Sequence, residues 1–160
     1  MIHRYTLLPI IALFVCISFS GCGAGVAPAV AETEETIKPI VFLNNYAAGL
    51  EIARQEKKPT LMFFSVPGNA GSQRMMETTF CDDEIRRLAE WLVCIYVDGS
   101  QESALCESLG ISSFPTIILS HTDGTEVHRL VGRQTSDQLA VQVHMLLQGI
   151  AMRPQVGTGR

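Results

Sequence analysis

Runs of apolar residues mark the strands that we expect in this chain. Residues 59–66 are almost wholly apolar, which is typical of a central strand covered on both faces. Residues 91–97 show the same pattern and predict a second buried strand. Three shorter strands are expected at residues 39–43, 116–120 and 126–131. An Asp-Gly pair between the last two predicts a hairpin turn.

Helices are expected between these strands. The first begins at Asn45, a favourable N-cap, and places Leu50 and Ala53 on one face. The last opens with Thr135 and Gln138 in the spacing of a capping box. Helices are thus predicted over residues 45–57, 69–80, 82–90 and 102–109 and from residue 135 onward. This order of strands and helices, with right-handed crossovers, predicts an α/β fold in which a mixed sheet lies between helices.

Several short motifs occur along the predicted domain. They are KKPTLMFF at 57–64, MMETTF at 75–80, VD at 97–98, GISSFPT at 110–116, DG at 123–124 and LVG at 130–132. In this order they resemble the thioredoxin superfamily, and above all exported thioredoxin-like domains such as the periplasmic C-terminal domain of the bacterial transmembrane disulfide reductase. The resemblance spans roughly residues 44–148 and implies a thioredoxin-like three-layer α/β/α sandwich.

The resemblance also implies a Cys-x-x-Cys pair where the second predicted helix begins. This chain has Asn69 and Ser72 at those positions, in Asn-Ala-Gly-Ser, and no other two cysteines have that spacing. The family needs a thiolate there, because a helix N-terminus lowers the pKa of a thiol. A serine hydroxyl is far less acidic and forms no disulfide. We therefore expect Asn69 to cap the helix; a catalytic role for the two degenerate positions is the alternative.

Other positions of the family's site also differ here. Gly68 replaces the usual tryptophan, and Phe63 replaces a buried acid that relays a proton. Pro115 matches the cis-proline that faces the site. The resemblance implies that the backbone groups of the preceding residue, Phe114, bind an extended peptide. Gly68, Phe114 and Pro115 are thus the expected peptide-binding residues. Phe114 either forms an apolar patch with Gly68 and Val66 or fills the space of the missing tryptophan.

The remaining cysteines have structural interpretations. Cys94 lies in an apolar strand and is expected to be a small buried hydrophobe. The resemblance places Cys81 and Cys106 on opposite faces of the sheet, which favours free thiols over a disulfide. A redox site that uses one of these cysteines is the alternative. The histidines lack metal-ligand spacing, so no metal site and no other cofactor are expected.

The N-terminus is typical of an export signal. An uncharged apolar run over residues 7–19 is followed by small residues and Cys22. The run is shorter than the roughly 20 residues of a bilayer span, so a retained transmembrane helix is only the alternative. Residues 19–22, Phe-Ser-Gly-Cys, resemble a bacterial lipobox, which implies a diacylglycerol on Cys22; an ordinary signal-peptidase site is the alternative. In such proteins an aspartate directly after the lipidated cysteine favours the inner membrane. This chain has Gly23 at that position, which favours the outer membrane.

These signals predict four segments along the chain. They are a signal peptide over residues 1–21, a lipidated cysteine and flexible tether over 22–38, a thioredoxin-like domain over 39–150 and a C-terminal tail over 151–160. This organisation predicts an exported protein that a lipid anchor holds at the periplasmic face of a bacterial membrane.

Charge and chemistry leave three classes of function. The full chain has a formal charge of −4, and no basic patch in the sequence indicates a nucleic acid partner. The main expectation is a non-catalytic module that binds an extended peptide or protein partner in the cell envelope. The alternatives are a thiol-disulfide oxidoreductase that acts through a non-standard cysteine, and a structural component of an envelope complex.

Overall fold

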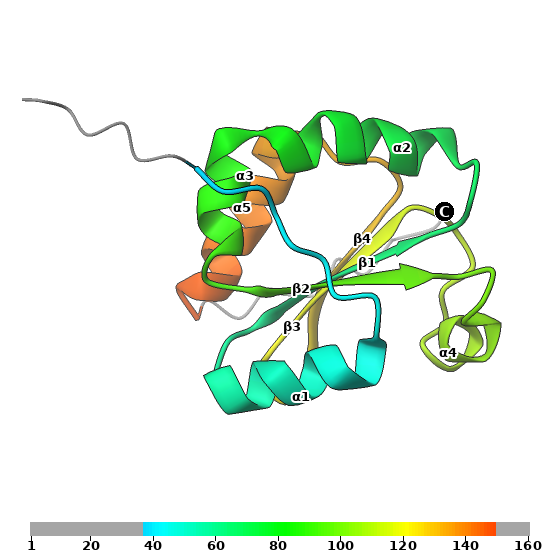
Figure 1. The fold of residues 1–160 in the computed structure, drawn as a ribbon, viewed down its shortest axis with the longest axis horizontal. Coiled ribbons are helices and arrows are strands. Elements are labelled where there is room, and N and C mark those ends of the chain that lie inside the picture. The colour runs from blue at the N-terminus through cyan, green and yellow to red at the C-terminus, as the bar shows by residue number, and fades with distance from the viewer. Residues whose placement is uncertain (1–36, 150–160) are drawn as a thin grey trace, which may run out of the picture. The chain divides into compact units, whose positions relative to one another are not determined.

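Residues 37–149 are described in a computed structural model of the chain, in which four strands form one mixed sheet (Figure 1). The strands are β1 (Thr60–Ser65), β2 (Val93–Asp98), β3 (Thr116–Ser120) and β4 (Glu126–Val131). They lie in the order β2-β1-β3-β4. β1 pairs parallel with β2 and antiparallel with β3, and β4 pairs antiparallel with β3. The predicted mixed sheet is confirmed.

Helices cover both faces of this sheet. They are α1 (Tyr46–Glu56), α2 (Ala70–Glu77), α3 (Asp83–Ala89), α4 (Ser103–Ser108) and α5 (Ser136–Leu147). One hydrophobic core lies under α2, α3 and α5, and a second lies under α1 and α4 (Figure 1). Leu61 and Phe63 of β1 belong to the first core, while Met62 and Phe64 belong to the second. The three-layer α/β/α sandwich is therefore confirmed.

The expected helix caps are present. The Oδ1 of Asn45 accepts a hydrogen bond of 2.9 Å from the Ala48 N–H at the start of α1. Thr135 and Gln138 exchange backbone and side-chain hydrogen bonds as a capping box at the start of α5. These caps satisfy N–H groups that have no partner within the helix.

Two elements differ from the prediction. The helix expected over 69–80 ends at Glu77, and residues 79–81 form a 3-10 turn. The Thr78 hydroxyl donates to the Arg74 carbonyl at 2.7 Å, and the Thr79 hydroxyl donates to the Gln134 carbonyl at 2.8 Å. The second of these bonds ties the turn to the chain before α5, so the helix does not continue.

The outer edge of the sheet also differs. Residues 39–43 were expected to form an edge strand, but only Leu43 pairs with β2, in one bridge with Ile95. The strand expected over 91–97 begins at Val93, because the N–H groups of Trp91 and Leu92 bond back to the last turn of α3. Trp91 is consequently 66% exposed. A wide pocket is left between residues 37–41 and α3.

Among residues 37–149, no helix is long and apolar enough to cross a membrane. The predicted signal peptide, Cys22 and the C-terminal tail over 151–160 lie outside the described residues.

Candidate functional site

The candidate site is the junction between the start of α2 and the loop that precedes β3. Asn69 is the N-cap of α2, as predicted. Its Oδ1 accepts hydrogen bonds from the Ser72 N–H at 2.8 Å and from the Ser72 hydroxyl at 3.1 Å. Ser72 is buried, so its hydroxyl finds its partner within the protein.

The Asn69 side chain also contacts the loop before β3. Its Nδ2 donates a hydrogen bond of 3.1 Å to the Phe114 carbonyl. The next peptide bond, between Phe114 and Pro115, is cis. A Cβ at Gly71 would lie only 3.0 Å from the Pro115 ring, so the backbone of α2 approaches this loop closely. The structure thus brings Asn69, Ser72, Phe114 and Pro115 together.

Gly68 and Phe114 do not form the apolar patch that was one of the two expectations for Phe114. Gly68 is exposed at a φ of +77°, and a Cβ placed on it would have no neighbour within 4 Å. The Phe114 ring packs instead on the core under α1 and α4, where a Cβ on Gly99 would come within 2.4 Å of it. The expected peptide-binding residues therefore separate into an exposed turn and a half-buried ring.

A shallow hollow of about 460 Å³ opens beside the Phe114 ring. Its apolar wall is formed by Phe114, Ile111 and the thiol-bearing side chain of Cys106. Polar groups of α4 and of the following loop form its rim, namely Ser103, Glu107 and Ser112. The hollow can accept an apolar side chain of a bound segment and offers hydrogen-bonding groups around it.

The thiols of the described residues lie away from the start of α2. Cys81, Cys94 and Cys106 are all free. Cys81 is exposed on the 3-10 turn after α2, where its Sγ donates to the Met76 carbonyl at 3.3 Å. Cys106 belongs to the core under α1 and α4, whereas Phe80, next to Cys81, belongs to the opposite core.

The two buried thiols are poor nucleophiles. Burial raises the pKa of Cys94 to about 12, which keeps it protonated at neutral pH. Burial also raises the pKa of Cys106, and the Glu102 and Asp98 carboxylates add to this effect. Thiol-disulfide exchange requires a thiolate, so neither side chain is suited to it.

A family model described as a thioredoxin-like domain matches residues 46–144, more than half of the 160 residues. The chain belongs to the thioredoxin-like family. This confirms the resemblance inferred from the motifs, and no curated protein sequence matches the chain. The matched residues begin at α1 and end within α5.

Solved structures of thioredoxin-like proteins are similar to this one. A thioredoxin from Thermus thermophilus is 18% identical, with a TM-score of 0.61 over 68% of this chain and 88% of that chain. The oxidised C-terminal domain of DsbD from Neisseria meningitidis is 16% identical, with a TM-score of 0.56 over 66% of this chain and 98% of that chain. A thioredoxin-fold protein from Helicobacter pylori is 21% identical, with a TM-score of 0.55 over 59% of this chain and 71% of that chain. Identities this low show the shared fold.

Sequence reasoning missed several residues of the hollow in this thioredoxin-like domain. Gly99 and Cys106 were not predicted to meet Phe114, although the ring can take this position only because Gly99 has no side chain. Gly110, which directly follows the helix predicted over residues 102–109, also lines the hollow. A glycine directly after a buried strand was the available signal, since glycine there permits close approach.

Proposed function

We propose that this chain is a redox-inactive thioredoxin-like module that binds an extended peptide or protein partner beside Pro115. The observation that carries the proposal is the Asn69 side chain, which caps α2 and bonds to the Phe114 carbonyl at the same time. By the family resemblance, Asn69 and Ser72 occupy the positions of the dithiol. Structural hydrogen bonds occupy both of these side chains.

The chemistry of the site supports a non-catalytic role. Dithiol exchange requires a sulfur nucleophile whose pKa the helix N-terminus lowers. Here Asn69 accepts the hydrogen bond from the Ser72 N–H, and the Ser72 hydroxyl donates to the same oxygen. No histidine contacts this hydroxyl through a hydrogen bond within residues 37–149, so nothing described there activates it.

The geometry next to the site supports partner binding. The hollow lies against Phe114, the residue that precedes the cis-proline. The Phe114 carbonyl oxygen has two lone pairs, and one of them accepts the hydrogen bond from Asn69 Nδ2. The other lone pair can accept a hydrogen bond from a backbone N–H of a bound peptide. Ser112 is exposed on the rim of the hollow. An apolar side chain in the hollow and a backbone bond at its edge together describe an extended peptide.

An insulin-reduction assay with dithiothreitol tests the absence of redox activity. We expect the wild-type chain to show no steady turnover above the dithiothreitol background. The double variant Asn69→Cys/Ser72→Cys should gain turnover, because the two side chains already contact each other at the start of α2. The single variant Asn69→Cys is the matched control and should not gain it. Steady turnover by the wild type would refute the proposal.

Photocrosslinking tests the binding of a partner. A photoreactive residue in place of Ser112, on the rim of the hollow, should crosslink to extended peptides of varied sequence. The matched control replaces Ser108, which is exposed on α4 and does not line the hollow. Equal labelling at both positions would contradict a peptide site. A single fixed partner at Ser112 would indicate the structural role instead.

A redox role through one cysteine is the second candidate, and the exposure of Cys81 is the observation that favours it. In that case the wild type would turn over insulin, and Cys81→Ala would abolish the turnover. Cys94→Ala serves as the control, because the Cys94 thiol is buried.

We further propose that the chain is exported and anchored to the periplasmic face of a membrane through a lipid on Cys22. The support is the sequence of residues 7–22, with its apolar run and its Phe-Ser-Gly-Cys segment. Cells fed a labelled fatty acid should label the wild-type chain and not the Cys22→Ala variant. Equal labelling of the two, or none in either, would refute lipidation.

A further inference from the structure

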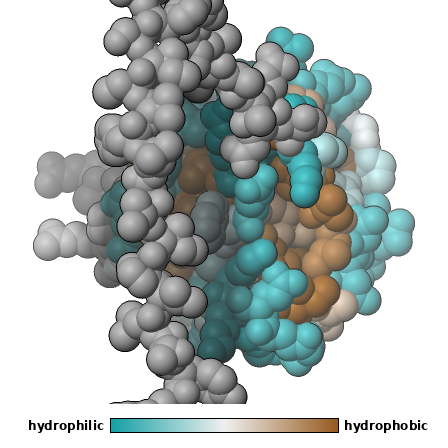
Figure 2. Space-filling model, turned by 60° about the vertical axis from the view of Figure 1, so that its left-hand side comes forward, coloured by the Kyte–Doolittle hydropathy of each residue, from teal (hydrophilic) through white to brown (hydrophobic). Residues whose placement is uncertain are grey.

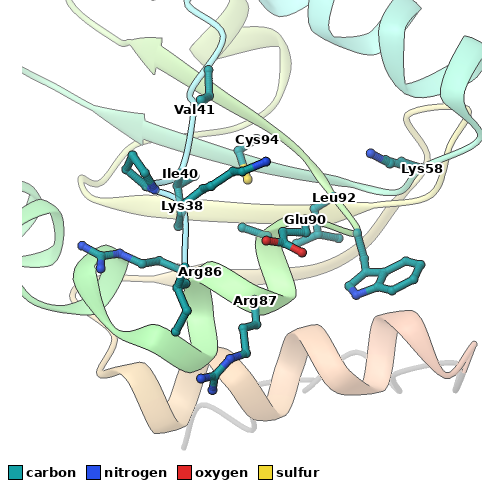
Figure 3. Close-up of a pocket in the computed structure, with 13 residues that line it drawn as sticks. Lys38, Ile40, Val41, Lys58, Arg86, Arg87, Glu90, Leu92 and Cys94 are labelled. Carbon is teal, nitrogen blue, oxygen red and sulfur yellow. The ribbon is translucent and has the colours of Figure 1, made fainter. Parts of the chain in front are cut away.

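A second pocket, distinct from the hollow, lies at the outer edge of β2 (Figure 3). Its volume is about 840 Å³, within the range of small-molecule sites. One wall is formed by residues 37–41, which diverge from β2 before Leu43. The opposite wall is formed by the last turns of α3 and by Trp91. Figure 2, which brings the left-hand side of Figure 1 forward, shows hydrophobic surface bordered by hydrophilic residues.

Positive charge is concentrated around this pocket. Its lining includes Lys38, Lys58, Arg86 and Arg87, and the acid among the lining residues is Glu90. Figure 3 shows these side chains spread around the pocket. The described residues hold nine Lys and Arg in all, so four of the nine gather here in a chain whose formal charge is −4. Such a local excess of cations attracts an anion.

Two of these four cations lack an ion-pair partner among the described residues, whereas Lys58 pairs with Glu56 at 3.1 Å. Within residues 37–149, Lys38 and Arg87 form no ion pair. The Nε–H of Arg86 is buried and has no hydrogen-bond acceptor there, and its Nη1 lies 3.5 Å from Asp83. A buried donor without an acceptor is unfavourable. The Arg86 side chain is 27% exposed, and a carboxylate or phosphate oxygen would bind the exposed part of its guanidinium.

The interior of the pocket is apolar. Its floor contains Leu92 and Cys94, which are buried, and its walls add Ile40 and Val41. Trp91 and Val41 are two of the large apolar side chains that remain strongly exposed. An inorganic anion would use the cations and leave this apolar surface in contact with water. An anionic head on an apolar body matches both parts of the lining.

We propose that this pocket binds an anionic amphiphile, with its head at the lysine and arginine side chains and its apolar chain against Leu92, Cys94 and Trp91. The same chemistry occurs in a free fatty acid and in an anionic phospholipid of a bilayer. The proposal does not depend on the function of the site near Pro115, because the two sites share no lining residue.

Trp91 provides the measurement, because it is the only tryptophan in the sequence and it lines the pocket. The full chain carrying Cys22→Ser is titrated with dodecanoate below its micelle concentration, and with dodecanol as the uncharged control. We expect a saturable change in Trp91 emission, with dodecanoate binding at least tenfold more tightly than dodecanol. In a second arm, vesicles of phosphatidylglycerol are compared with vesicles of phosphatidylcholine.

Charge variants locate the binding. The double variant Arg86→Gln/Arg87→Gln should weaken the binding of dodecanoate at least tenfold. If this variant loses its circular dichroism signal, the double variant Lys38→Gln/Lys58→Gln repeats the test, because both lysines lie outside the helices. The matched control, Arg74→Gln/Arg133→Gln, removes two exposed charges elsewhere and should stay within twofold of the wild type.

Each outcome of these titrations decides for or against the pocket. An anion-dependent response to dodecanoate alone assigns a free ligand, and a response to phosphatidylglycerol alone assigns a bilayer lipid. No response to either, equal binding of dodecanol, or an equal loss in the control variant would overturn the proposal.

Discussion

Replacing Asn69 by alanine tests whether one side chain holds the start of α2 to the loop of Pro115. The change removes the acceptor of the Ser72 N–H, the acceptor of the Ser72 hydroxyl and the donor to the Phe114 carbonyl. Loss of an N-cap costs about 1 kcal/mol. Loss of the bond to the loop costs about 1 kcal/mol more, and the buried Ser72 hydroxyl adds up to about 1 kcal/mol. We expect Asn69→Ala to lower the free energy of unfolding by about 2–3 kcal/mol.

Asn69→Asp separates the two roles of this side chain. Aspartate retains an oxygen that accepts from the Ser72 N–H, and its charge is favourable at a helix N-terminus. It has no N–H to donate to the Phe114 carbonyl, so the bond to the loop is lost and a carboxylate oxygen faces that carbonyl, a repulsion that the favourable charge at the helix N-terminus offsets. We therefore expect aspartate to cost about 1 kcal/mol, clearly less than alanine.

Urea unfolding followed by far-ultraviolet circular dichroism measures these differences, since α2 and the other helices dominate that signal. The slope of the transition should stay the same in all variants, because the surface exposed on unfolding is unchanged. An Asn69→Ala variant within about 0.5 kcal/mol of the wild type would refute the reasoning, since that is the size of an ordinary surface substitution. So would an aspartate variant as unstable as the alanine variant.

Three further predictions concern thiols and glycine. Because burial raises the pKa of Cys94 from 9.0 to about 12, the unfolded chain ionises first as pH rises. The contribution of this group to the free energy of unfolding should thus be constant below pH 9 and fall above pH 9 by about 1.4 kcal/mol per pH unit. Urea unfolding at several pH values would show this slope, and Cys94→Ala should remove it. In a thiol titration of the lipidated, signal-free chain we expect only Cys81 to react in the native state and Cys81, Cys94 and Cys106 to react after unfolding; fewer than three would reveal a disulfide. Gly99→Ala places a Cβ within 2.4 Å of the Phe114 ring and should destabilise the chain by about 1–3 kcal/mol, whereas Gly110→Asn, at a φ of +65° with open space, should cost less in the same unfolding assay.

The elements of the fold were predictable where local signals agree with burial. The apolar run of β1 indicates a strand covered on both faces, and all six of its residues are buried. Asn45 and Thr135 mark helix starts because their side chains satisfy nearby N–H groups, which is a local effect. The position of Asn69 at the start of α2 followed from the same rule.

Two of the remaining features depend on contacts between segments that are far apart in the sequence, and a third depends on a local turn. The break after Glu77 follows from the bond between Thr79 and the Gln134 carbonyl, 55 positions later. The direction of the Phe114 ring is set by the space above Gly99, which no local pattern records. The exposure of Trp91 follows from the turn that ends α3, although tryptophan in an apolar run predicts a buried strand. Long-range packing decided the first two of these features, and a local turn decided the third.

The single bridge at Leu43 has a mechanical consequence. In the described part of the chain, this residue alone pairs with the outer side of β2, through the Cys94 carbonyl and the Tyr96 N–H. A pull on the chain from its N-terminal side would load these two bonds before any other pairing of the sheet. Their rupture would leave β2 as an open edge that can accept a strand from a neighbouring molecule. Resistance to force, and resistance to strand exchange between copies, would then be set by the same pair of hydrogen bonds.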